Sequence, residues 1–204
     1  MRIVASLGAL LLWSFASTAP AAETYVIDPA KSTVQVHVGK TGLLSFAGHL
    51  HEVIAPVTGT ITADPDHLAA SRVELGFATA QMRVSADGEP KGDAPKVEEV
   101  MRGPAVLDVP RFPEIHFASK AVAGRLNSPG VYALTIAGVL SLHGITREIS
   151  VPVTVTIEGR TLTAVARTTI RHDQFAMKAV SAGGGTVKVA NEIRIDFRIV
   201  AEQR

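Results

Sequence analysis

Two histidines one residue apart, His49 and His51, are the residues of this chain whose type and spacing come closest to a chemical site. On a β-strand, residues two apart point the same way, with their Cα atoms about 6.6 to 7 Å apart. Two imidazoles placed in this way could reach one metal ion. They could equally contact the head group of a ligand or hydrogen-bond within the protein, because a buried polar group needs a partner. The sequence leaves these three alternatives open.

No other motif points to catalysis. The chain contains no G-x-S-x-G, no H-E-x-x-H and no Walker loop. The glycines of Gly183–Gly185 lead into a strand pattern, so they lack the helix N-terminus that binds phosphate. His143, next to Gly144, is expected at a turn or at a barrel end, and His37 on an outer face. We therefore expect a protein that is not an enzyme and that uses no cofactor.

The elements that must position these residues are strands. In Val187–Ile199 the odd positions are apolar and the even positions are charged, with Ala190 and Asn191 as the exceptions. Such alternation predicts a strand with one dry face and one wet face. Ile145–Ile157 alternates in the same way, and one polar face along each strand is typical of antiparallel sheets. Signals for helix are few, and the clearest is the spacing within Lys96–Arg102.

The length of these strands favours a closed sheet. Thirteen residues, as in Val187–Ile199, span roughly 43 Å at about 3.3 Å per residue, which is long for a sandwich. We predict an all-β fold, an antiparallel barrel of about eight strands. The interior of such a barrel is either filled by side chains or holds one small ligand. A second long strand is expected over His49–Ala63, with a break at Pro56.

The residues expected to contact an apolar ligand combine the histidine pair, the inward positions of the strands and apolar residues at the mouth. They are Phe46, His49, His51, Val53, Leu75, Phe77, Met101, Phe117, Leu134, Ile136, Val153, Ile195 and Phe197. Further interior positions are expected at Val57, Ile115, Val151 and Ile193, with Met82 and Phe112 at the mouth. Burial of about fifteen methylene equivalents would gain roughly 12 kcal/mol, part of which the ordering of the chain cancels.

The beginning of the chain predicts export. Arg2, the apolar run Leu7–Phe15 and the small residues Ala19–Ala22 have the pattern of a signal peptide over residues 1–22, too short to span a bilayer comfortably. Its removal leaves one domain over residues 23–204, most simply in a bacterial periplasm. The remaining 19 basic and 19 acidic residues balance, which argues against nucleic acid as a partner. No later segment reads as transmembrane, and the chain has no cysteine.

Five motifs occur in an order that resembles the YceI family of exported lipid- or polyisoprenoid-binding barrels. They are Tyr25–Val34, Gly59–Pro65, Leu107–Phe117, Gly138–Ile149, and Arg171–Phe175 taken together with Gly184–Ile193. The resemblance covers nearly all of Tyr25 to Ala201. It implies an extended, lipocalin-like antiparallel barrel with a short helix near the mouth. It also implies the binding of a long apolar or amphiphilic molecule, and it implies no catalytic residues.

The leading hypothesis is a periplasmic protein that sequesters or carries a long-chain isoprenoid, a quinone-like molecule or a lipid in its barrel. The rival is a metal-binding protein or metal-dependent enzyme that uses His49 and His51. A third hypothesis is a solid barrel that contacts a protein partner through the polar loop Ser85–Pro95. A homodimer is compatible with all three.

Overall fold

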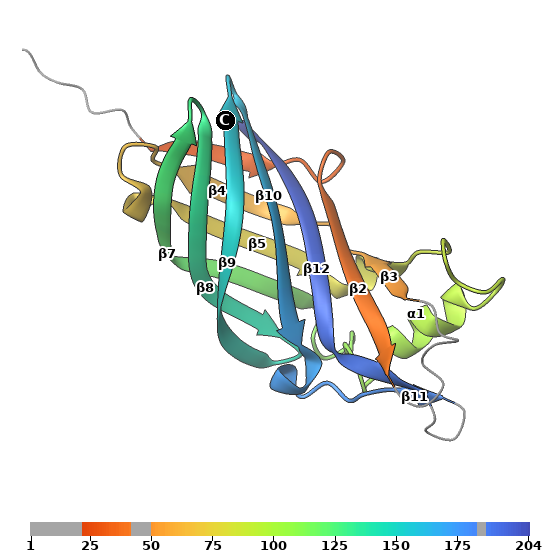
Figure 1. Ribbon diagram of the computed structural model, residues 1–204. Coiled ribbons are helices and arrows are strands. Elements are labelled where there is room, and N and C mark those ends of the chain that lie inside the picture. Colours follow the sequence, from red (N-terminus) through yellow and green to blue (C-terminus); the bar gives the residue numbers. More distant parts are fainter. Residues whose placement is uncertain (1–21, 42–49, 183–186) are drawn as a thin grey trace, which may run out of the picture.

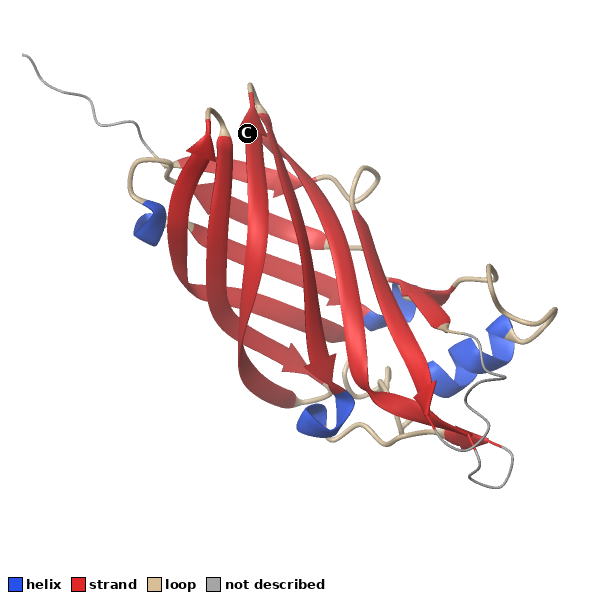
Figure 2. Cartoon of the chain, viewed as in Figure 1, coloured by secondary structure: helices blue, strands red, loops and turns tan. Residues whose placement is uncertain are grey.

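The computed structural model describes residues 22–41, 50–182 and 187–204, and this part of the chain is almost entirely β (Figures 1 and 2). The strands are β1 (Glu23–Ile27), β2 (Thr33–Thr41), β3 (His51–Ile54), β4 (Thr58–Ala63), β5 (Arg72–Ala78), β6 (Arg83–Val84), β7 (Glu114–Ser128), β8 (Val131–Leu142), β9 (Ile145–Glu158), β10 (Thr161–Arg171), β11 (Ser181–Ala182) and β12 (Val187–Gln203). The helices are α1 (Ala94–Arg102) and the 3₁₀ turns η2 (Leu68–Ala70), η3 (Thr79–Gln81) and η4 (His172–Phe175).

Eight of the strands close into a barrel. The order β1-β4-β5-β7-β8-β9-β10-β12 is antiparallel throughout, and β12 returns to β1 through the pairs from Tyr25–Gln203 to Ile27–Ala201. The predicted antiparallel barrel of about eight strands is thus confirmed. The other half of β12 pairs with β2, and β2, β3 and β6 extend the wall toward the end of the barrel that carries α1 (Figure 1).

The expected break at Pro56 is present. The structure has two strands, β3 and β4, separated by Ala55, Pro56 and Val57. Proline has no N–H to donate to a ladder and therefore interrupts a strand. The break lets the chain pass from the β2-β3-β6 extension into the closed part of the barrel. The helix expected over Lys96–Arg102 is also confirmed and begins slightly earlier, at Ala94, with Pro95 in its first turn.

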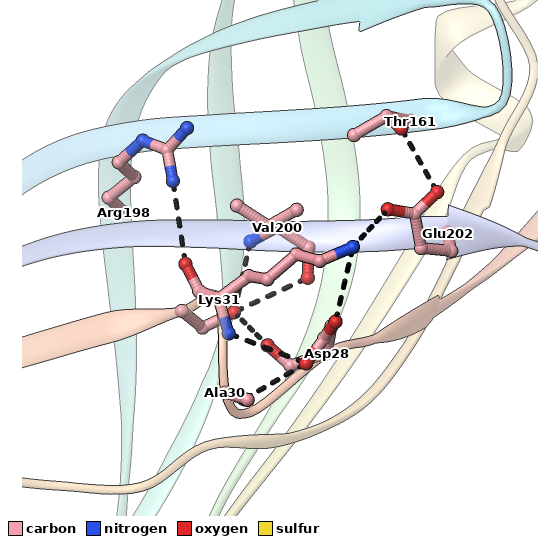
Figure 3. Close-up of polar contacts among 8 residues, drawn as sticks. Asp28, Ala30, Lys31, Thr161, Arg198, Val200 and Glu202 are labelled. Carbon is pink, nitrogen blue, oxygen red and sulfur yellow. Dashed lines mark hydrogen bonds and ion pairs between the residues drawn. The ribbon is translucent and has the colours of Figure 1, made fainter.

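The turn between β1 and β2 fastens the closure (Figure 3). The Ser32 hydroxyl donates to the carbonyl of Asp28 at 2.7 Å and accepts the N–H of Val200 at 3.0 Å. The ammonium of Lys31 lies 3.0 Å from a carboxylate oxygen of Glu202 on β12. This contact lowers the pKa of Glu202 and raises the pKa of Lys31, but both groups are exposed, so the ion pair adds little stability. The hydrogen bonds of the Ser32 hydroxyl to backbone groups add to the closure made by the β1–β12 pairs.

Asn191 is the polar residue that interrupts the apolar positions of the last strand, and its position has a structural reason. The register between β12 and β2 shifts between Val189 and Ile193, so β12 bulges there. The bulge contains Asn191, whose amide donates to the carboxylate of Asp173 at 2.7 Å and accepts the backbone N–H of Asp173 at 3.2 Å. Asn191 therefore holds η4 against the end of the barrel.

A buried tyrosine is predicted to lower the stability of the fold at alkaline pH. The Tyr25 side chain is fully buried and donates to Glu23 Oε2 at 2.7 Å. Burial, this hydrogen bond and the Glu23 charge raise the pKa of Tyr25 to about 12. Because the folded state keeps the phenol proton more tightly, its stability is intact below about pH 10, the unfolded pKa, and falls by about 2 kcal/mol as the pH rises to about 12.

We expect Tyr25→Phe to remove this alkaline loss. The measurement is the thermal unfolding midpoint of both proteins across the alkaline range, alongside tyrosinate absorbance. Tyr132, the other tyrosine, remains in the variant and serves as an internal reference. An equal alkaline decline in both proteins would contradict the assignment.

Candidate ligand-binding cavity

The barrel encloses an elongated cavity of about 250 Å³. Along β8 its wall runs from Tyr132 to Leu142, a rise of roughly 33 Å at about 3.3 Å per residue. A small volume spread over such a length is a narrow channel. Its wall consists almost wholly of apolar side chains from the barrel strands, from β2 and β3, and from Met101 on α1.

Most residues predicted for the site lie on this wall. They are Val53, Leu75, Phe77, Met101, Phe117, Leu134, Ile136, Val153, Ile195 and Phe197. The additional positions Ile115, Val151, Ile193 and Met82 lie there as well. That these side chains contact a ligand stays a prediction. Phe46 and His49 lie outside the described residues.

His51 has a partner within the protein. On β3 it pairs with Val38, which lies on the cavity wall, so His51 shares the inner face of the sheet. Its Nδ1 contacts a carboxylate oxygen of Glu89, whose side chain is only 1 % exposed. The histidine therefore holds the loop before α1 against β3. Across residues 22–41, 50–182 and 187–204, no three His, Asp or Glu side chains are placed to hold a metal ion.

The structure places Val57 and Phe112 differently from the prediction. It places His143 and His37 as predicted. Val57 is buried but lies between β3 and β4, away from the cavity wall. Phe112, expected at the mouth, instead packs edge-on against His143, with ring centroids 4.9 Å apart. His143 lies in the β8–β9 hairpin with a φ of 51°, at a barrel end as expected. His37 lies on the outer face as expected, with its Nε2 3.1 Å from Asp196.

Sequence reasoning missed the contribution of β10. Leu162, Ala164, Thr168 and Ile170 lie on the cavity wall, but their alternation is weak because two of the four are small or polar. The opposite face of β10 carried the usable signal. Charged residues such as Arg167 occupy odd positions there, which assigns the even positions to the inner face. The small side chain of Ala164 also explains why space remains beside this strand.

The few polar groups of the wall lie toward its two ends. At the η2 end, Asp64 Oδ1 accepts the N–H of His67 at 2.8 Å, and the Asp64 N–H donates to Ser71 Oγ at 3.0 Å. Thr168 lies toward the other end, where β10 leads into η4. The middle of the channel offers no hydrogen-bonding partner, so it favours an apolar occupant.

A closed antiparallel barrel around an apolar channel, with one short α-helix at its end, defines a lipocalin-like barrel protein. The chain belongs to the family of the YceI-like domain, whose model matches residues 25–201. No curated protein matches the sequence. None of the helices in the described ranges has the length and apolar content to cross a membrane.

Solved structures share this fold. BcnA of Burkholderia cenocepacia has a TM-score of 0.64 at 23 % identity, over 85 % of this chain and 98 % of BcnA. A polyisoprenoid-binding domain of Saccharophagus degradans, implicated in plant cell wall breakdown, has a TM-score of 0.63 at 12 % identity, over 88 % and 98 %. The YCEI protein of Campylobacter jejuni has a TM-score of 0.57 at 12 % identity, over 72 % and 81 %.

Proposed function

We propose that the protein is exported to the periplasm and holds the tail of a long-chain isoprenoid, a quinone-like molecule or a lipid in its channel. The observation that carries this proposal is the channel itself, long, narrow and apolar along its middle. The polyisoprenoid-binding domain among the similar structures supports the same class of ligand. The function is binding and carriage, without a chemical step.

The shape of the channel selects for a linear tail. A volume of about 250 Å³ is near the lower end of the range for small-molecule sites. Because that volume is spread along the strands, a bulky fused-ring molecule would meet the wall before it was buried. A single unbranched or methyl-branched chain can lie along the barrel and contact both sides.

Hydrophobic transfer supplies enough free energy. Each buried methylene contributes about 0.8 kcal/mol, so ten of them contribute about 8 kcal/mol. The cost of immobilising the ligand consumes several kcal/mol of this gain. Contacts along the full channel are needed for micromolar affinity, which predicts weak binding of short chains.

The test is native mass spectrometry of the protein purified from its exported form, followed by solvent extraction. We expect one apolar molecule per chain, released on denaturation, and a mature protein that begins at Glu23. Protein purified without cargo is incubated with a long-chain prenol and with the same prenol shortened to one isoprene unit. The proposal fails if neither purified nor incubated protein carries a long-chain molecule.

A further inference from the structure

The pairing between β9 and β10 in the barrel wall is incomplete. The two strands pair only from Glu158–Thr161 to Val153–Ala166. Beyond this point, residues 145–152 of β9 pair only with β8, and residues 167–171 of β10 pair only with β12. Figure 1 shows β9 and β10 diverging below their shared hairpin. We call this unpaired stretch the β9–β10 seam.

Pro152 explains where the seam begins. In a two-residue hairpin the residues that flank the loop form a hydrogen-bonded pair. From there along the strand, the backbone N–H and C=O groups of successive residues point alternately toward the hairpin partner and away from it. Even residues of β9 thus direct their N–H groups toward β10. Odd residues direct theirs toward β8, as the bond from Ile157 N–H to the Gly130 carbonyl shows. Pro152 is the next even position after the last pair and has no N–H to donate.

Residues of the channel wall flank the seam. Ile149 and Val151 on its β9 side lie on the channel wall, as do Thr168 and Ile170 on its β10 side. Its far end is closed by η4, where Phe175 is fully buried and its carbonyl lies 3.0 Å from His143 Nδ1. The seam is therefore bounded by Pro152 at one end and Phe175 at the other.

Arg147 lies at this seam with its charge uncompensated. It pairs with Leu140, a channel-wall residue, so its side chain starts on the inner face, yet the residue is exposed. The guanidinium contacts the carbonyl of its neighbour Thr146 at 3.3 Å, on the edge that faces β10. Within the described residues no carboxylate pairs with Arg147.

The nearby carboxylates already have cationic partners. Glu148 pairs with Lys120, and Asp173 pairs with Arg171 at 2.8 Å. These contacts lower the pKa of both carboxyl groups, so each stays ionised and paired with its own cation. Arg147 is therefore available to a negative group from outside the protein.

We infer that the ligand of the channel is an anionic amphiphile, whose tail lies among the apolar side chains and whose phosphate or carboxylate head lies in the β9–β10 seam against Arg147. This inference rests on the proposed function. Thr168 lies on the wall toward the same end of the barrel. The reverse orientation would place the anion beside the Asp64 carboxylate at the η2 end, where like charges repel.

The test compares three probes with the same chain, hexadecyl phosphate, palmitate and hexadecanol, by titration calorimetry. The variant is Arg147→Gln, and the matched control is Arg125→Gln, which removes an exposed arginine of β7 that has no ion pair among the described residues. We expect Arg147→Gln to weaken binding of one or both anions by about tenfold, the effect of losing one charge-assisted hydrogen bond. Hexadecanol affinity and the unfolding midpoint should not change.

Added salt provides an independent readout. It should weaken anion binding to the parent protein and to Arg125→Gln more than to Arg147→Gln, because only the first two keep the charge. A loss confined to hexadecyl phosphate indicates a phospholipid-like or prenyl phosphate ligand, and a loss confined to palmitate indicates a fatty acid. Equal binding of all three probes, unaffected by Arg147→Gln, overturns the inference but leaves the proposed function intact. If no probe binds, the proposed function fails as well.

Discussion

Replacement of Ala164 by phenylalanine is expected to lower the affinity for a long-chain ligand about 100-fold. Ala164 is buried on the channel wall and pairs with Val155 on β9 and Ile199 on β12. Because β10 is fixed on both sides at this point, the new ring must enter the channel. If it displaces about four methylenes of the tail, the loss is about 3 kcal/mol, which is about two factors of ten in affinity.

The matched control is Val165→Phe. Val165 is the next residue along β10 and is 49 % exposed on the outer face, so the same ring added there does not reach the channel. Hexadecanol titration of the parent protein and both variants gives the affinities, and thermal unfolding reports the fold. We expect Ala164→Phe to remain folded because the ring occupies existing space. Equal affinities in the two variants would show that the tail lies elsewhere.

The strands were predictable from local patterns, and strand length favoured a barrel, but the two strands that pair to close it were not predictable. Alternation over Ile145–Ile157 and Val187–Ile199 marks β9 and β12 because each has one face in the core. Closure depends on the pairing of β1 with the end of β12, at opposite ends of the chain. Alternation gives the face of a residue and carries no information about the neighbouring strand.

The same limit explains which parts of the site were missed. The alternation of odd and even positions along each strand placed residues such as Leu134 and Ile195 on the inner face correctly. It could not show that β9 loses its β10 neighbour at Pro152, because β9 continues its alternation beyond that residue while paired with β8. The partner of His51 is likewise invisible to periodicity, since Glu89 lies in a loop.

The end of the barrel at η4 provides the largest expected effect on stability. Phe175 is fully buried, and its turn contacts β9, β10 and β12. We expect Phe175→Ala to lower the free energy of unfolding by about 3 to 5 kcal/mol, since it removes a buried aromatic ring and leaves a cavity. Denaturant unfolding measures the change. Gln174→Ala, an exposed neighbour in the same turn, is the control and is expected to change stability by less than about 0.5 kcal/mol.

Phe175→Ala should also separate stability from retention of the ligand. Phe175 bounds the β9–β10 seam, so its truncation loosens the wall there without placing an atom in the channel. Stopped-flow displacement should show faster release of hexadecanol at temperatures where the variant remains folded. Ala164→Phe should do the reverse, with weak binding and near-parent stability. If Phe175→Ala loses stability but releases the ligand at the parent rate, η4 supports the fold alone and the tail leaves by another route.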